Sequence, residues 1–336
     1  DMLLNPTLPA EALERIRAQR LVALTQGRAQ PGTIASRVYP RVLYGTSHAY
    51  GRFATDESLK AITRDDVVAM HKAFFRPGRA LVTVVGDVTA SEVKPLVEKA
   101  LAPWSKGGER PSFSYSPLPE RRPTAIYLVD KSGAAQSVVT MGHPGPPRDT
   151  PDYYALEVMN TMLGGMFQSR LNANIREEKG YSYGVGSGFD YGKGPGAFSA
   201  GGDIVSDKTD AALVEFMKEL RGILGSRPVT DDELKTAKDS LIQRLPSAFG
   251  SVAGINSALT RLWTEGLPDD YYQRYSAAIA AVTKEDVLRV ARKHIDLERM
   301  AIVIVGDRAS IEATLERTGI APIVHLDIEG RPVASR

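Results

Sequence analysis

The feature that most constrains the fold of this chain is an internal repeat with an offset of 220 residues. Residues 61–68 have the sequence AITRDDVV, and residues 281–288 have the sequence AVTKEDVL. A second pair of segments keeps the same offset, with LVTVVGD at 81–87 and AIVIVGD at 301–307. Self-similarity at a fixed spacing marks a structural unit that is used more than once. The sequence therefore predicts two related domains, or parts of them.

Both copies predict the same local structure. Thr63 and Thr283 are expected helix N-caps, each followed three residues later by an aspartate that completes a capping box. Each helix precedes a β-branched apolar run that ends in Gly-Asp, which is typical of a buried strand closing on a turn. We therefore expect a strand at 81–87 in the first copy and another at 301–307 in the second.

Between the copies, residues 104–123 contain four prolines and two glycines and little periodic apolar content. Such a composition is typical of a linker between domains. The second copy then begins near Thr124, and its counterpart in the first copy would lie ahead of residue 1. We therefore expect roughly the first hundred residues of the first copy to be missing.

The second copy predicts an α+β fold. We expect strands at 125–129 and 136–141, a helix from Thr150 that ends at Gly164-Gly165, a helix over 168–179 that ends at Gly180, and a glycine-rich hairpin over 181–200. This order of strands and helices favours helices packed on a mixed, largely antiparallel sheet.

Composition and missing motifs exclude several classes of function. The 42 basic and 40 acidic residues are scattered, which argues against nucleic acid as a partner. No apolar run approaches the roughly 20 residues of a membrane span, so we expect no membrane insertion. The chain has no cysteine, which excludes disulfides and thiolate metal sites and fits either cytosol or periplasm. Of the two compartments, we expect a bacterial periplasm.

The histidines show no metal-binding or catalytic pattern. No two of the five lie at i, i+4 spacing, and neither His-Glu-x-x-His nor its inverted form occurs. We expect each to be a packing or surface residue: His48, His71, His143, His294 and His325. The glycines of 184–188 lack the strand-to-helix context that a dinucleotide loop or a nucleophilic serine requires.

The segment from Arg176 to Tyr183, REEKGYSY, has two interpretations. It can be an ordinary solvated helix end. Alternatively, Arg176 on the last helical turn and Tyr183 on the following strand converge across a tight turn at Gly180. A guanidinium and a phenol together suit a peptide carbonyl or a developing oxyanion.

These motifs together resemble the M16 zinc peptidase family, the group of pitrilysin and the mitochondrial processing peptidase. The resemblance rests on 164–171 (GGMFQSRL), on 176–183, on His48-x-Tyr-Gly51 and on the two Val-Gly-Asp strand ends. It implies two homologous α+β domains, the first of them incomplete. The implied division is 1–105 for the C-terminal half of the first domain, 106–122 for a linker, 123–325 for the second, inactive domain, and 326–336 for a tail.

The resemblance also implies a function. Active members bind zinc through an inverted His-x-x-Glu-His and a distant Glu in the first domain, and an Arg and a Tyr of the second domain bind substrate; the matching residues here are Arg176 and Tyr183. The inverted motif would lie ahead of residue 1. The third ligand is expected near Ala23, but the segment 18–28 contains no Asp or Glu.

We therefore expect a non-catalytic, substrate-binding subunit of a two-component zinc metalloendopeptidase that acts on peptides. Such a chain has no catalytic residue and binds no metal, and the zinc belongs to a partner subunit or to the missing segment. The expected partners are a peptide substrate and a zinc-bearing M16 subunit in a heterodimer, or a second copy in a homodimer. Two alternatives stay open: a fragment of a catalytic M16 peptidase, and a non-enzymatic scaffold derived from the family.

Overall fold

A computed structural model of the chain describes residues 2–104 and 113–333. The chain divides into two compact units. The first combines Asp1–Gln26, Ala54–Ser114 and Arg244–Tyr271, and the second combines Gly27–Phe53, Tyr115–Gln243 and Tyr272–Arg336. Residue 105 of the predicted first domain, residues 106–112 of the predicted linker and the last three residues of the predicted tail lie outside the described part.

The first unit, where it is described, contains helices and no strand. Its elements are α1 (Ala10–Gly27), α3 (Asp56–Ala61), α4 (Arg64–Phe74), η2 (Pro77–Arg79), α5 (Ala90–Leu101), η7 (Pro246–Phe249) and α9 (Val252–Glu265). The predicted cap of α4 is confirmed, because Thr63 accepts a hydrogen bond from the amide of Asp66 and Asp66 accepts one from the amide of Thr63.

The second unit contains a six-stranded sheet in the order β3-β4-β2-β5-β1-β6. The strands are β1 (Ala125–Asp130), β2 (Gln136–Pro144), β3 (Ser182–Phe189), β4 (Ala197–Val205), β5 (Ala301–Gly306) and β6 (Ile323–Leu326). Pairing is antiparallel from β3 through β4 and β2 to β5, and parallel from β5 through β1 to β6. The sheet is mixed and largely antiparallel, which confirms the predicted α+β class.

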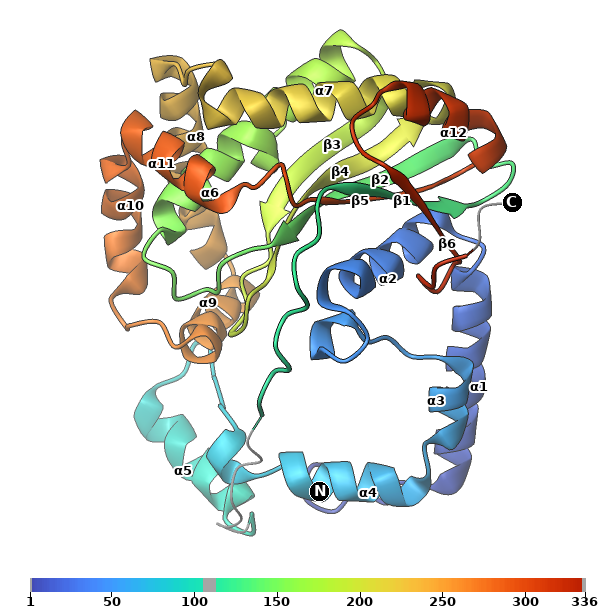
Figure 1. Cartoon of the computed structure of the whole chain (residues 1–336). Helices are drawn as coiled ribbons and strands as arrows, with labels where there is room; N and C mark the ends of the chain where they lie inside the picture. The colour runs from blue at the N-terminus through green and yellow to red at the C-terminus, as the bar shows by residue number, and fades with distance from the viewer. Residues whose placement is uncertain (1, 105–112, 334–336) are drawn as a thin grey trace. The chain divides into compact units, whose positions relative to one another are not determined.

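Helices cover both faces of this sheet (Figure 1). The helices of the second unit are α2 (Pro31–Tyr44), η1 (Ala49–Gly51), α6 (Tyr153–Asn160), η3 (Thr161–Gly165), η4 (Asn172–Glu178), η5 (Ser206–Lys208), α7 (Thr209–Arg221), η6 (Gly222–Ser226), α8 (Asp231–Arg244), α10 (Tyr271–Ala281), α11 (Lys284–His294) and α12 (Arg308–Arg317). The predicted cap at Thr283 is confirmed, and α11 begins and ends 220 residues after α4. The helix predicted to start at Thr150 begins at Tyr153 instead, because the Thr150 hydroxyl accepts a hydrogen bond from the amide of Asp152 within the preceding turn.

Strand β5 is buried along its whole length. Ile302 and Ile304 point into the core that α6, α7, α11 and α12 share with one face of the sheet. Val303 and Val305 point into the second core, which α2 forms with the opposite face. A strand buried on both faces requires a continuous apolar run instead of an alternating one, and the sequence AIVIVG meets that requirement.

The strand predicted at 81–87 is wrong. Residues 81–85 form no strand, and Val82 and Val84 are 52% and 51% exposed, whereas their repeat counterparts Ile302 and Ile304 are fully buried. In the second copy, β5 pairs with β1 and β2. Among the described residues, the run at 81–85 pairs with no strand, so its backbone groups lack the ladder that β5 has.

Each unit contains one helix that the repeat would place in the other unit. Helices α2 and α9 have the same length and stand 221 residues apart, which is close to the repeat offset. Nevertheless α2 belongs to the second unit and α9 to the first. The apolar stripe of α2, with Ile34 and Val38, is buried in the second core.

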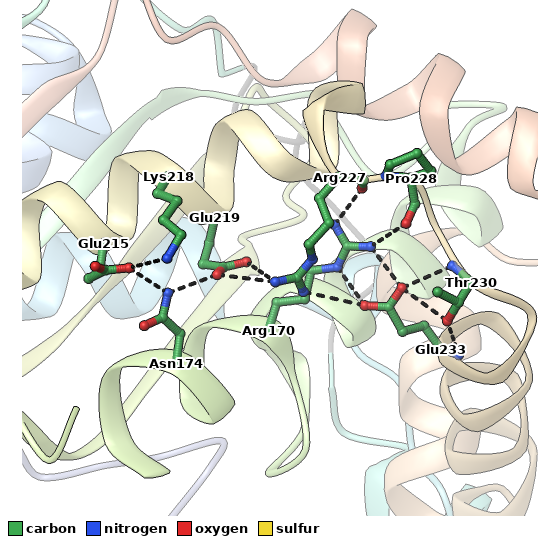
Figure 2. Close-up of polar contacts among 9 residues, drawn as sticks. All are labelled: Arg170, Asn174, Glu215, Lys218, Glu219, Arg227, Pro228, Thr230 and Glu233. Carbon is green, nitrogen blue, oxygen red and sulfur yellow. Dashed lines mark hydrogen bonds and ion pairs between the residues drawn. The ribbon is translucent and has the colours of Figure 1, made fainter. Parts of the chain in front are cut away.

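A polar network fixes the helix η4 and the residues just before it (Figure 2). Arg170, which is only 3% exposed, donates two hydrogen bonds of 2.7 and 2.8 Å to the carboxylate of Glu233. It also donates to the carbonyl oxygen of Arg227 at 3.0 Å. Glu233 in turn accepts from the amide of Thr230, and the Glu233 amide donates to the Thr230 hydroxyl, which closes a capping box at the start of α8.

One turn further along the chain, Asn174 extends this network to α7. Its amide group donates to Glu215 at 2.7 Å and to Glu219 at 2.8 Å. Glu219 is buried and also pairs with Arg227 at 3.1 Å. The network therefore joins η4 to α7 and to the first turn of α8.

No helix in the described part of the chain is long and apolar enough to cross a membrane.

The contrast between the repeat copies predicts unequal effects of equivalent substitutions. Ile304→Ala removes a fully buried side chain, so we expect it to lower the free energy of unfolding by about 2–5 kcal/mol. Val84→Ala, at the equivalent repeat position, should change it by less than about 0.5 kcal/mol. Urea denaturation followed by circular dichroism measures both, and equal losses would contradict the difference in burial.

The network predicts an acid-dependent loss of stability. Burial alone would raise the pKa of Glu233, but the hydrogen bonds from Arg170 and from the Thr230 amide outweigh it and lower the pKa from 4.5 to about 2. Because the pKa of Glu233 is lower in the folded state, its ionised carboxylate stabilises the fold at pH values above the unfolded-state pKa near 4.5. This stabilisation is lost as the pH falls towards 2. The free energy of unfolding of Glu233→Gln should therefore fall less over this window than that of the wild type.

Asp232→Asn is the matched control, because Asp232 is an exposed neighbouring acid without a contact to Arg170 in the described structure. Its pH dependence should follow the wild type. Parallel acid curves for the wild type and Glu233→Gln would show that the ion pair does not set this dependence.

Candidate functional site

The predicted site lies where η3, a short loop, η4 and β3 follow one another in the chain. Both η3 and η4 are π-helical, and π-helical turns are frequent at functional sites. Gly164 near the end of η3 approaches β3 so closely that a Cβ there would lie 2.3 Å from the amide nitrogen of Ser187. Gly180 then ends the helical segment with a φ of +65°, as predicted for its C′ position.

Arg176 lies in η4 and stacks on an aromatic ring. Its guanidinium carbon is 4.3 Å from the centre of the Phe167 ring, which is a cation–π contact. Its Nε lies 3.5 Å from a carboxylate oxygen of Glu177. The Arg176 side chain is one-third exposed and Phe167 is 58% exposed. A permanent positive charge is therefore held over an aromatic ring that faces solvent.

Tyr183 stands on a β-bulge in β3. The pairing of β3 with β4 passes from Ser182–Ile204 to Val185–Gly202, so two residues of β3, Tyr183 and Gly184, oppose one residue of β4. Bulges of this kind re-aim side chains and are frequent next to active sites. The Tyr183 side chain is 87% exposed, and no hydrogen bond engages its hydroxyl among the described residues. The phenol is thus available to a ligand.

Arg176 and Tyr183 lie on either side of the turn at Gly180, but no contact between them exists in the described structure. Arg176 contacts Phe167 instead. Sequence reasoning did not single out Phe167, although the segment GGMFQSRL contains it. No local pattern signalled its exposure, because apolar aromatic side chains are usually buried.

All five histidines have partners within the protein. His48 accepts a hydrogen bond from the amide of Tyr50 and stacks between Tyr44 and Tyr115, at 5.3 and 5.6 Å between ring centres. The His-x-Tyr-Gly motif is therefore part of an aromatic cluster. The contacts of the others are His71 with the carbonyl oxygen of Leu3, His143 with the amide of Asp296, His294 with Asp152, and His325 with Glu312.

Asp152 is the centre of a charged cluster that fixes α6 to α11. Its buried carboxylate accepts hydrogen bonds from Arg289 at 2.6 Å, Lys293 at 2.7 Å and His294 at 2.8 Å. Burial would raise the pKa of Asp152, but hydrogen bonds from His294, Lys293 and Arg289 hold it well below its usual range. Since these donors engage both carboxylate oxygens, the cluster is an internal tie between two helices.

The described residues do not fit a zinc ion. In residues 2–104 and 113–333, no group of three His, Asp or Glu side chains is placed to hold a metal. Helix α1, where the family's third ligand is expected, has no acidic residue between Ala18 and Gly27.

Comparison with known proteins agrees with the predicted resemblance. A family model described as the peptidase M16 inactive domain matches residues 61–241, which is more than half of the chain. An uncharacterized zinc protease of Mycobacterium leprae is 27% identical over 331 residues, covering 94% of this chain and 71% of that protein. A protein of Helicobacter pylori named as a non-peptidase homolog is 24% identical over 312 residues, covering 92% and 71%.

Among solved structures, a peptidase M16 inactive domain from Pseudomonas fluorescens superposes with a TM-score of 0.79 at 28% identity, covering 90% of this chain and 72% of that one. A protease from Helicobacter pylori has a TM-score of 0.75 at 18% identity, with 87% and 70% covered, and shows the shared fold. The chain belongs to the family of the peptidase M16 inactive domain.

Proposed function

We propose that this chain is the substrate-binding, non-catalytic component of a two-component zinc metalloendopeptidase that acts on peptides. In this proposal Arg176 and Tyr183 contact the peptide, and Phe167 holds the guanidinium in place. The zinc belongs to an M16 partner, with which the chain forms a heterodimer.

The observation that carries the proposal is the exposure of Tyr183. A tyrosine that is 87% exposed on a bulged strand gains little from packing. Three residues near one turn, Phe167, Arg176 and Tyr183, present a ring, a permanent charge and a phenol to solvent. Peptide backbones offer the carbonyl oxygens that guanidinium and phenol groups bind.

In the proposed complex, Arg176 places its charge near the peptide that is cleaved, and Tyr183 donates a hydrogen bond to its carbonyl oxygen. Such donors contribute most when negative charge develops on that oxygen. Loss of one donor from a preorganised oxyanion site costs on the order of 10²- to 10³-fold in turnover. The chain would then contribute to catalysis by a partner without supplying a metal ligand.

The names of relatives support both this proposal and a second candidate. The Helicobacter pylori relative is named as a non-peptidase homolog, which agrees with a binding role. The Mycobacterium leprae relative is named as a zinc protease, so the second candidate is a part of a polypeptide that holds its own zinc. The complete reading frame separates the two, since it either contains an inverted His-x-x-Glu-His or does not.

Substitutions at the site test the proposal. We expect Arg176→Ala to weaken binding of fluorescein-labelled casein peptides about tenfold, a loss of about 1.4 kcal/mol. Arg176→Lys should restore little, because an ammonium lacks the planar fork of a guanidinium. Tyr183→Phe should lower turnover by the complex with the zinc partner on the order of 10²-fold. Fluorescence anisotropy and peptide hydrolysis measure these effects.

Arg221→Ala provides the control, because Arg221 is an exposed arginine at the end of α7. It should bind peptide as the wild type does. The melting temperatures of all variants should stay close to that of the wild type, since neither Arg176 nor Tyr183 is buried. Unchanged peptide binding and turnover in the Arg176→Ala, Tyr183→Phe double variant would refute the proposal in favour of a scaffold.

A further inference from the structure

One side chain, that of Asn172, touches all three segments of the candidate site. Asn172 is the first residue of η4, the helix that contains Arg176. Its Oδ1 accepts a hydrogen bond of 3.0 Å from the amide of Val185 in β3. Its Nδ2 donates to the carbonyl oxygen of Met166, at 3.5 Å, in the loop just before Phe167. Loop, helix and strand are thus linked through one amide group.

On the strand, this link ends at Val185, next to the bulge that presents Tyr183. Val185 is the residue at which regular pairing with β4 resumes. On the other side of the bulge, the Ser182 hydroxyl lies 2.6 Å from the carbonyl oxygen of Asp203 and accepts from the amide of Gly184 at 3.0 Å. Two polar side chains, Ser182 and Asn172, therefore bracket the two bulged residues.

The segment of η4 around Asn172 is itself held in place by hydrogen bonds to other helices. Arg170 and Asn174, on either side of Asn172, tie this segment to α7 and α8 (Figure 2). Any displacement of the strand relative to the helix must therefore break or stretch the bond from Val185 to Asn172.

We propose that Asn172 is a positioning residue, which fixes the backbone under Tyr183 relative to the helix that holds Arg176. The effect of Asn172 on peptide binding rests on the function proposed above. Its effect on the position of the backbone under Tyr183 does not. This positioning role requires a hydrogen-bond acceptor at the place of Oδ1. Asn172→Asp keeps an acceptor for the Val185 amide, and Asn172→Ala removes it.

Asn160 supplies a matched control. It also binds the backbone of β3 through a side-chain amide, donating to the carbonyl oxygen of Ser187 at 3.1 Å and accepting from the Ser187 hydroxyl at 2.7 Å. This contact lies beyond the bulge, on the side away from Tyr183. Asn160→Ala should therefore loosen the strand without changing the placement of Tyr183.

The geometric claim is tested with spin labels. Because the chain has no cysteine, nitroxides attached at Glu178→Cys and Tyr183→Cys report only the separation of η4 and the bulge. Dipolar broadening in frozen solution should become weaker and more heterogeneous when Asn172→Ala is added, and stay unchanged when Asn160→Ala is added. Identical spectra for the two additions would overturn the proposal, whether or not the chain binds peptide.

The functional consequence is tested with the casein-peptide assay on otherwise native chains. Asn172→Ala should weaken binding about tenfold, which corresponds to about 1.4 kcal/mol. Asn172→Asp should recover most of this affinity, and Asn160→Ala should bind as the wild type does. If the Arg176→Ala, Tyr183→Phe double variant loses affinity but Asn172→Ala matches Asn160→Ala, the positioning role is wrong and the proposed function stands. If the double variant binds normally, the proposed function fails and the spin labels alone decide the role of Asn172.

Discussion

The pairing of β5 between β1 and β2 is the interaction on which the rest of the second unit depends. Both edges of β5 form ladders, parallel on one side and antiparallel on the other. Both of its faces are buried, one under α2 and the other under the larger group of helices. The repeat copy at 81–85 has similar side chains but pairs with no strand in the described part of the chain, and Val82 and Val84 are exposed. Apolar β-branched sequence alone is thus insufficient, because backbone groups also need partners.

The candidate site sits at the edge of this sheet, where rigidity and exposure coexist. Buried ion pairs and amide hydrogen bonds around Arg170 and Asn174 hold the helix. The helix η4 and the strand β3 present large side chains to solvent. Leaving such side chains exposed costs free energy. A site built to bind a ligand requires this combination, because groups held in place beforehand lose little freedom on binding.

Much of the fold was predictable from local patterns. The capping boxes at Thr63 and Thr283 and the glycine stop at Gly180 depend on neighbouring residues only, and the structure has all three. The failed strand at 81–87 and the exchange of α2 with α9 depend on partners distant in sequence, which no local pattern encodes. The position of the predicted pair Arg176 and Tyr183 followed from the motif. The bulge and the Asn172 link did not, since they depend on a one-residue change of register between two strands. The contact of Phe167 with Arg176 did not either, since it joins a loop residue to a helix nine positions later in the chain.

In the proposed function, this chain holds a peptide for a zinc ion that an M16 partner binds. The most direct measurement is peptide hydrolysis together with zinc content, for the chain alone, for an M16 partner with the inverted His-x-x-Glu-His, and for their mixture. We expect no stoichiometric zinc and no cleavage for the chain alone, and cleavage by the mixture that depends on Arg176 and Tyr183. One tightly held zinc per chain, lost on His48→Ala or His71→Ala and accompanied by cleavage without a partner, would contradict it.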